Sequence, residues 1–492
     1  MSFNGKMQNT ENNVPILERL DLGDESADDA PLDDLMSYFV EQKSFSKFID
    51  FRKKLIIAQA RKGNGKSAIL QWIFCKASEK KDNVVIKCRG AELVRSRFAL
   101  PPLPDDTPNT LIHDWMSRIC TLINRELAKK INFALTDNEI ALVETAELDG
   151  FKQKNIIGAL LDRFSLKLSK GSVELASEKL RIQNEIETLK RQKNFKAIII
   201  IDDLDATFQN KPEECLSLST FFSACRYLIQ DFPGIVIRTS LRTDVWPMIR
   251  PLDEALDKVE QYIHEIHWSE KDFVQLINKR ISHSLNLETE NNALDYVFEK
   301  NINWGRKTVF NYVVLYTLSY ERPRWGIQLC KLALEHALEK NHNIISQNDI
   351  EFAWVKYGKL RITDLESEHR HQCSKIGAIV QAFRGQPAQM TRDGLLNFIS
   401  SHISNRDAIC IDGNNTRKSL DIAFFLYRIG FIVARSHDED FYYHYSFEEF
   451  SSLLSSKISK DTDMEWEIHP CYRKALDIKS LNAAQRESSP RI

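Results

Sequence analysis

The sequence predicts an α/β fold built on a five-stranded parallel sheet. Three observations favour it. Short apolar runs alternate with helical stretches through the first half of the chain, as in parallel α/β proteins. The first run stops at a glycine-bearing loop that opens a helix. The most apolar run ends in two adjacent aspartates, Asp202 and Asp203.

The five runs differ in their patterns. The third is continuously apolar, as a central strand buried on both faces should be. The fifth alternates apolar and polar residues, which suits an edge strand. The expected strands are Lys54–Gln59, Asn83–Cys88, Ala197–Asp202, Gly234–Leu241 and Gln261–Trp268.

The composition excludes several classes of protein. The 492 residues are 43% hydrophobic and 28% charged, enough for two or three domains with real cores. A net charge of −2 gives no global basic field. No window approaches the roughly 20 apolar residues of a membrane helix, and the N-terminus lacks a signal pattern. Nine cysteines without a C-x-x-C pair indicate reduced thiols, and we expect a cytoplasmic protein.

Changes in pattern along the chain indicate the domain organisation. Residues 89–196 separate the second and third strands, far more than the roughly dozen residues that one crossover needs. We therefore expect a helical insertion. The predicted divisions are a flexible acidic tail at 1–34 and an α/β core at 35–268, which begins with a short helix (35–50) and carries the insertion at about 90–195. A helical lid at 269–365, a winged helix with a C-terminal unit at 366–476 and a tail at 477–492 follow.

The loop after the first strand has the spacing of a phosphate-binding P-loop, the Walker A motif. Glycines let successive backbone N–H groups point at phosphate oxygens, and the following helix adds its positive end. Lys66 should reach the β- and γ-phosphates of ATP, and the Ser67 hydroxyl should ligate Mg²⁺. One departure is Ala60, which stands where the first glycine usually lies. The residues expected around the phosphates are Ala60, Arg61, Lys62, Gly63, Asn64, Gly65, Lys66, Ser67 and Ala68.

The third strand ends in the sequence Asp202-Asp203-Leu204-Asp205. Ligands of open α/β sheets bind at the carboxyl ends of the strands. We expect Asp202 to hold Mg²⁺ through water, and Asp203 to orient or deprotonate the attacking water as a catalytic residue. This pattern corresponds to a Walker B motif.

Together these motifs resemble the AAA+/STAND branch of P-loop ATPases. Within it the chain is similar to origin-recognition and replication-initiator ATPases and to winged-helix ATPases of phage-defence loci, over roughly Leu35–Leu476. The resemblance implies a polar sensor at the end of the fourth strand, where Thr239 and Ser240 stand. It also implies a lid arginine that meets the γ-phosphate, for which Arg324 is the candidate.

Some roles stay open at the level of sequence. Arg242 and Asp244 form a switch pair, or Arg242 only braces the strand end. Arg324 is a sensor, or it only braces helices. An arginine finger supplied by a second copy would imply a homo-oligomer. The candidates for it are Arg226, Arg238 and Arg250.

Residues 372–450 read as three helices, with a loop (ICIDGNN) before the third, and then a β-hairpin, the order of a winged helix. Its third helix would carry the cations Arg417, Lys418 and Arg428, which favours DNA. Its wing tip would carry the acids Asp438, Glu439 and Asp440, which favours a protein contact. The histidines His369, His371, His437 and His444 lack the ligand spacing of a zinc site and are expected to be solvated.

The sequence therefore predicts an ATP- and Mg²⁺-dependent ATPase that acts as a regulatory switch. Bacterial antiphage defence or a DNA transaction, with a partner effector, is the expected setting. A DNA-binding initiator or loader is one alternative. A nucleotide-dependent scaffold that hydrolyses slowly is the other.

Overall fold

A computed structural model describes residues 15–80, 83–95, 107–130, 186, 189–190, 195–206, 208–288, 290–305, 307–405, 407–435, 443–444 and 465–479. The chain divides into two compact units. The core unit is Ser26–His267. The C-terminal unit is Trp268–Ile492 together with Met1–Glu25. Much of the predicted helical insertion, at about 90–195, lies outside the described residues.

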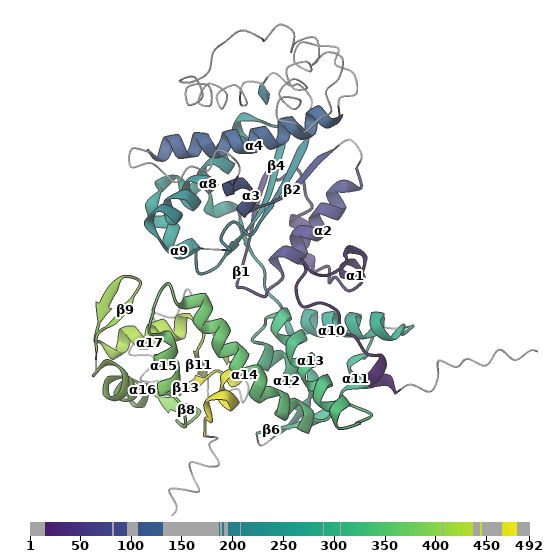
Figure 1. Cartoon of the computed structure of the whole chain (residues 1–492), viewed down its shortest axis with the longest axis vertical. Coiled ribbons are helices and arrows are strands. Elements are labelled where there is room, and N and C mark those ends of the chain that lie inside the picture. Colours follow the sequence, from purple (N-terminus) through teal and green to yellow (C-terminus); the bar gives the residue numbers. More distant parts are fainter. Residues whose placement is uncertain are drawn as a thin grey trace, which may run out of the picture. The chain divides into compact units, whose positions relative to one another are not determined.

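The core unit contains the predicted parallel sheet, with the strand order β2-β3-β4-β1-β5 (Figure 1). Each strand begins within two residues of its predicted start, because a run buried on both faces is visible in the sequence. Among the described strands, β5 pairs with β1 alone, so it is the predicted edge strand. The strands are β1 (Leu55–Ala60), β2 (Val84–Arg89), β3 (Ala197–Asp202), β4 (Ile235–Arg242) and β5 (Ile263–Glu265).

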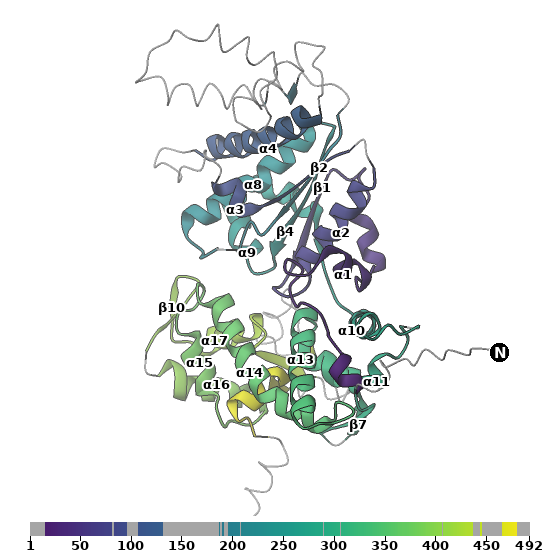
Figure 2. The same cartoon turned by 45° about the vertical axis from the view of Figure 1, so that its right-hand side comes forward.

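Helices cover both faces of this sheet (Figure 2). On one face, α4 (Pro108–Lys130) and α8 (Pro212–Asp231) pack against each other and onto alternate strand residues such as Ile57, Ile199 and Ile237. The opposite face is covered by α2 (Lys66–Ser78), which contacts β3 and β4. The short helices α3 (Gly90–Arg95) and α9 (Trp246–Ile249) follow β2 and β4. This arrangement leaves the carboxyl ends of the strands at one edge, where the two motifs meet.

The start of the chain differs from the prediction of a loose tail at 1–34. Within residues 15–25, Leu17, Leu20 and Leu22 are buried. The guanidinium of Arg280 donates hydrogen bonds to the carbonyl oxygens of Leu22 and Asp24. The segment is acidic overall, but these three leucines pack on the rest of the C-terminal unit.

The helix expected over 35–50 is also different. The structure has α1 over Leu32–Ser37 and a 3-10 helix over Lys43–Lys47. Phe39 lies between these two helices and Phe45 lies in the second one. Together with Trp72 of α2 they form an aromatic cluster, in which the ring centroids of Phe39 and Trp72 are stacked 5.3 Å apart. Aromatic burial fixes this segment without a continuous helix.

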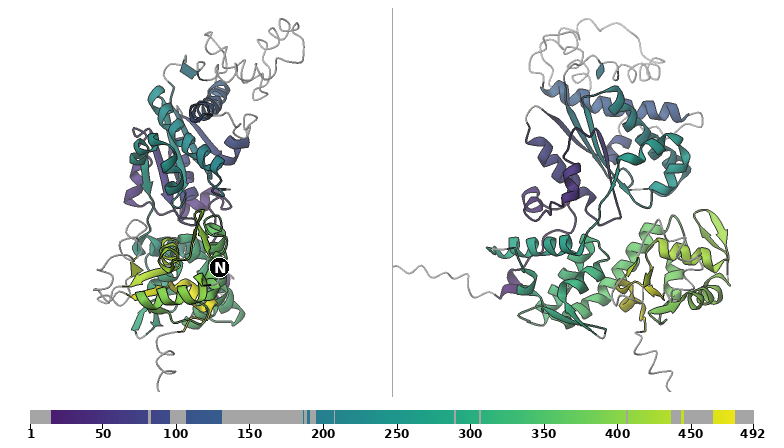
Figure 3. Two further views of the ribbon diagram at one scale, coloured as in Figure 1. Left: turned by 90° about the vertical axis from the view of Figure 1, so that its left-hand side faces the viewer. Right: turned by 180° about the vertical axis from the view of Figure 1, so that it is seen from behind.

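The C-terminal unit begins with a group of helices (Figure 3). Two of them, α13 and α14, pack along each other and enclose much of the helical core. A two-stranded antiparallel ribbon, β6 (Asn301–Trp304) with β7 (Lys307–Phe310), was not predicted. The helices are α10 (Glu270–Leu285), α11 (Leu294–Val297), α12 (Asn311–Ser319), α13 (Pro323–Glu339) and α14 (Gln347–His369).

Within its described residues, the second half of this unit has four α-helices and a four-stranded sheet of order β12-β11-β13-β8. The predicted loop ICIDGNN is a hairpin, β9 (Ile409–Ile411) with β10 (Asn414–Thr416), turning at Asp412-Gly413. The other elements are α15 (Ile376–Ala382), β8 (Gln389–Thr391), α16 (Arg392–Ile399), α17 (Ser419–Arg428), β11 (Ile432–Arg435), β12 (Tyr443–His444), β13 (Glu465–Ile468) and α20 (Pro470–Arg473).

No helix in the described parts of the chain is long and apolar enough to cross a membrane. All nine cysteines lie in described parts and carry free thiols. Seven of them are buried, where they fill space between apolar side chains.

Candidate nucleotide-binding site

The loop between β1 and α2 has the backbone of a phosphate cradle. Gly63 and Gly65 adopt φ angles of 87° and 84°, which side chains disfavour, and Gly65 caps α2. The loop thus turns toward the positive end of a 13-residue helix. Ala60 is the last residue of β1, 3% exposed and paired in register with Arg242. Because Ala60 belongs to the strand, its methyl group takes no space from the loop.

Lys66 is the first residue of α2, and its side chain folds back over the loop. Its ammonium donates hydrogen bonds to the carbonyl oxygens of Ala60 (3.1 Å) and Arg61 (3.4 Å). Burial lowers the pKa of Lys66, and the nearby carboxylates of Asp205 and Asp202 oppose that shift. The cation therefore lies between the loop and the acidic strand end. Ser67 and Ala68 follow on the same half-buried turn.

Asp202 ends β3 and is 4% exposed. Its Oδ1 accepts hydrogen bonds from the Ser240 hydroxyl (2.6 Å) and from the backbone N–H of Asp203 (2.9 Å). Because β4 lies between β1 and β3, the end of β4 brings Ser240 beside the acidic pair. The neighbouring Thr239 hydroxyl is buried and has no hydrogen-bond partner among the described residues. Two polar β4 residues thus stand at the predicted sensor position.

Asp203 occupies the left-handed region, with φ at 54°. That conformation is uncommon for residues other than glycine, although aspartate tolerates it better than most. Burial, followed by the charges of Asp202, Asp28 and Asp205, raises the pKa of Asp203 from 3.8 to about 6. A carboxylate with a raised pKa is a stronger base near neutral pH. This property fits the predicted role of Asp203 toward water.

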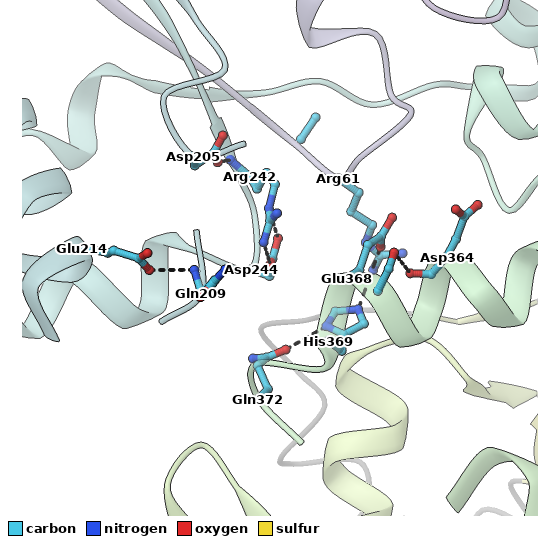
Figure 4. Close-up of polar contacts among 12 residues, drawn as sticks. Arg61, Asp205, Gln209, Glu214, Arg242, Asp244, Asp364, Glu368, His369 and Gln372 are labelled. Atoms are coloured by element: carbon cyan, nitrogen blue, oxygen red, sulfur yellow. Dashed lines mark hydrogen bonds and ion pairs between the residues drawn. The ribbon is translucent and has the colours of Figure 1, made fainter. Parts of the chain in front are cut away.

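Asp205 was part of the acidic run but received no role from the sequence. It is 2% exposed, and its Oδ2 accepts a hydrogen bond from the backbone N–H of Arg242 at 2.6 Å (Figure 4). Burial raises its pKa. The Arg242 guanidinium forms a two-point ion pair with Asp244, at 2.7 and 3.3 Å. The structure thus pairs Arg242 with Asp244, and Asp205 ties the end of β3 to the end of β4.

Gly90 is a second feature that sequence reasoning missed. A Cβ atom at this position would lie 2.3 Å from the Cα atom of Leu204. Any side chain would therefore displace the turn that carries Asp203. In the sequence, a lone glycine just after a predicted strand was the only sign of this close contact with Leu204.

The oxygen donors fit a magnesium ion. Mg²⁺ prefers oxygen ligands and typically takes one or two protein oxygens together with phosphates and water. Ser67 and Asp202 supply a hydroxyl and a carboxylate at the edge where the P-loop opens. The described residues hold no cluster of three or more His, Cys, Asp or Glu side chains that could bind a metal alone. The site would therefore bind Mg²⁺ with a nucleotide rather than by itself.

Other predicted residues lie elsewhere. Arg324 is half-buried on the first turn of α13, in the C-terminal unit, so its role toward the nucleotide stays a prediction. Arg238 is fully buried inside the core sheet, where it cannot serve as an arginine finger. His369 is buried, and its Nδ1 lies 2.7 Å from the Oε1 atom of Gln372, so it is not the solvated side chain expected (Figure 4). Arg226 and Arg250 remain as finger candidates.

Sheet order and motif placement give this unit an α/β P-loop fold of the AAA+ type. Residues 271–366 match a family model described as a FunZ-associated C-terminal helical domain. The chain is 24% identical over 377 residues to the transposon gamma-delta 80.3 kDa protein of Escherichia coli strain K12. That alignment covers 75% of this chain and 51% of the relative, so the chain spans about half of it.

Solved structures with a similar chain path include two archaeal proteins and one bacterial motor. The Aeropyrum pernix ORC2 protein, solved in ADPNP and ADP complexes, has 12% identity and a TM-score of 0.38 over 90% of this chain and 93% of that one. The Aeropyrum pernix ORC1 protein in complex with DNA has 10% identity and a TM-score of 0.34 over 90% and 93%. The Thermotoga maritima RuvB Holliday junction branch migration motor has 10% identity and a TM-score of 0.32 over 88% and 98%.

Proposed function

We propose that this protein binds and hydrolyses ATP with Mg²⁺ and uses the nucleotide state as a regulatory switch. One observation carries the proposal: the Lys66 ammonium lies between the glycine-containing loop and buried carboxylates. Both lie where the carboxyl ends of the parallel strands meet. The raised pKa of Asp203 beside this cation adds support, because shifted pKa values cluster at functional sites.

In the proposed reaction, the loop amides and Lys66 hold the β- and γ-phosphates. Bound Mg²⁺ would neutralise charge that develops on the phosphate oxygens. Ser67 and Asp202 would hold the ion. Asp203 would accept a hydrogen bond or a proton from the attacking water, because its raised pKa leaves it basic near neutral pH. Ser240 keeps Asp202 oriented through its 2.6 Å hydrogen bond.

Turnover by the full-length protein tests the proposal. ATP hydrolysis should be measured with and without DNA, beside Lys66→Ala and Asp203→Asn. Lys76→Ala is a matched control for the lysine, because Lys76 lies on the same helix and is paired with Glu79 on its exposed side. Absence of both nucleotide binding and turnover in the unmodified protein would reject the proposal.

The setting of the switch is a second part of the proposal. We place it in a DNA transaction or in antiphage defence, acting with an effector protein and as a homo-oligomer. The name of the 24% identical relative refers to a transposon, which favours the DNA transaction over antiphage defence. ATP turnover stimulated by DNA, or by products of neighbouring genes, would separate the two.

A DNA-binding initiator or loader is the other candidate. The elements α15, β8, α16, α17, β11 and β13 follow the order expected of a winged helix, with the hairpin β9–β10 before α17 and β12 before β13. Strand β13 pairs with both β8 and β11. Arg417 and Lys418 precede α17 rather than lying on it, and Arg428 is ion-paired with Asp412. The predicted DNA contact of this domain therefore rests on Arg417 and Lys418. Loss of DNA binding on their replacement by Ala would favour the loader.

A further inference from the structure

A polar cavity lies at the edge of the core sheet opposite the nucleotide site. It encloses about 550 Å³ and opens at the amino ends of three strands. Lys54 immediately precedes β1, Lys196 precedes β3, and Gly234 precedes β4. The carbonyl oxygens of Lys54 and Lys196 accept backbone hydrogen bonds from Ile237 and Val84, so the sheet fixes both positions.

The charge on the walls of this basic cavity is mostly positive. Four cations, Arg52, Lys54, Lys80 and Lys196, face one carboxylate, Asp50. Arg52 forms an ion pair with that carboxylate: its Nε donates to Oδ1 at 2.8 Å and its Nη2 donates to Oδ2 at 3.1 Å. No carboxylate of the described residues lies within ion-pair distance of the three lysines. The Lys54 ammonium donates instead to the carbonyl oxygen of Pro233 at 2.7 Å.

Half-buried aromatic rings line the cavity beside these cations. The Phe51 ring lies 5.7 Å from the Lys196 ammonium and 5.5 Å from the Arg238 guanidinium. Arg238 donates to the carbonyl oxygens of Phe48 (2.7 Å) and Asp50 (2.9 Å), which holds the segment that carries Phe51. Phe195 is the other ring.

The direction of the pKa shift of His264 agrees with a positive potential on this side of the unit. Burial lowers the pKa of His264, and the charges of Lys47, Lys53 and Arg238 lower it further. His264 belongs to the edge strand β5, and its ring lies 6.1 Å from the Phe48 ring. The positive charge therefore extends beyond the cavity walls.

We propose that the basic cavity binds the sugar–phosphate backbone of a nucleic acid strand. Two strand spacings and a two-residue difference in register separate Lys54 from Lys196, so their backbones are held about 12 Å apart. Cations attached at such separate points can contact successive phosphates of one strand. The aromatic rings favour nucleic acid over an acidic peptide, because bases and sugars pack on such rings.

This surface deepens the proposed DNA transaction but does not depend on ATP hydrolysis. Binding should be measured by fluorescence anisotropy with a labelled 30-nucleotide single strand and a 30-base-pair duplex, between about 50 and 200 mM salt. The full-length protein is compared with the double variant Lys80→Glu and Lys196→Glu. We expect a loss of affinity of about tenfold or more, and a salt slope reduced by about one to two.

A charge-matched variant, Lys43→Glu and Lys258→Glu, is the control. Both lysines are exposed in the same unit and outside the cavity, so net charge changes equally. The control should keep its affinity and salt slope within about twofold. Equal losses in both variants, or no binding by the unmodified protein, would overturn the proposal. Binding of polyglutamate in place of either nucleic acid would also overturn it.

The same titration in the Lys66→Ala background separates this inference from the ATPase proposal. If Lys80→Glu and Lys196→Glu reduce the affinity in the Lys66→Ala background as well, that loss supports the basic cavity whatever the outcome for hydrolysis. Melting curves of the double variant establish that it is folded, and the milder pair Lys80→Gln and Lys196→Gln should give a smaller loss in the same direction.

Discussion

Asp203→Asn should stop ATP turnover and at the same time stabilise the core unit above neutral pH. The pKa of Asp203 is raised from 3.8 to about 6, chiefly by burial and by the charges of neighbouring aspartates. A carboxylate with a raised pKa is costly to ionise in the folded protein. The cost is absent below the unfolded pKa, grows between about pH 4 and 6, and is complete above that range. Asparagine removes it and also accepts the left-handed backbone at φ 54°.

The size of this effect follows from the shift. Two pKa units correspond to about 3 kcal/mol, at 1.36 kcal/mol per unit. Asp203 is only half-buried, so solvent screening reduces the expected gain to about 1–2 kcal/mol. For a unit of this size, that gain raises Tm by roughly 2–8 °C at pH 8. Below pH 4, the two proteins should melt alike.

Thermal melts of the nucleotide-free protein at pH 3.8, 6 and 8, with turnover measured at pH 8, test the reasoning. Asp231→Asn is the control, because Asp231 is an exposed carboxylate at the end of α8. A gain in Tm that does not change with pH would refute the raised pKa. Unchanged turnover would show that another group positions the water.

Three further predictions concern charged side chains. Lys66→Ala should weaken ATP binding by about 100-fold or more in calorimetry, and Lys76→Ala should not, because only Lys66 lies at the phosphate loop. Arg324→Ala should weaken an ATP analogue more than ADP in parallel titrations if it meets the γ-phosphate, since that contact exists only with ATP; equal weakening would remove it from the site. Arg322→Met leaves Glu368 buried without its partner at 3.0 Å and should cost about 3–5 kcal/mol of stability in chemical denaturation. A loss below about 1 kcal/mol would contradict that account.

The sequence predicted the five core strands well because strands buried in a sheet appear as short apolar runs. Four isoleucines in Ile198–Ile201 can lie only inside the sheet. It also placed Lys66 and Asp202 correctly at one edge, since parallel strands share their carboxyl ends. Contacts between distant segments were not predictable. The role of Asp205 depends on a backbone N–H of Arg242, 37 residues away, which no local pattern reveals.

Three other predictions were wrong because each relied on a single feature of the sequence. Acidic composition at the start of the chain concealed Leu17 and its neighbours, which are buried against α10 and α13. The segment around Asp412-Gly413 was interpreted as a loop, although an Asp-Gly pair between short β-type runs favours a hairpin. Both residues have positive φ, at 49° and 81°. Arg238 was considered for an arginine finger, but its aliphatic stem and three carbonyl contacts suit the interior of the sheet.

The surroundings of Arg324 decide what its substitution can report. On the same helix turn, the Trp325 ring lies 4.0 Å from the Arg322 guanidinium and 4.4 Å from that of Arg361. Arg322 and Glu368 form a buried ion pair, which ties the start of α13 to the end of α14. These contacts hold the turn without Arg324, so Arg324→Ala should leave the helix start in place. A normal melt combined with selective loss of ATP affinity would therefore identify a ligand contact, and a large fall in Tm would identify a brace.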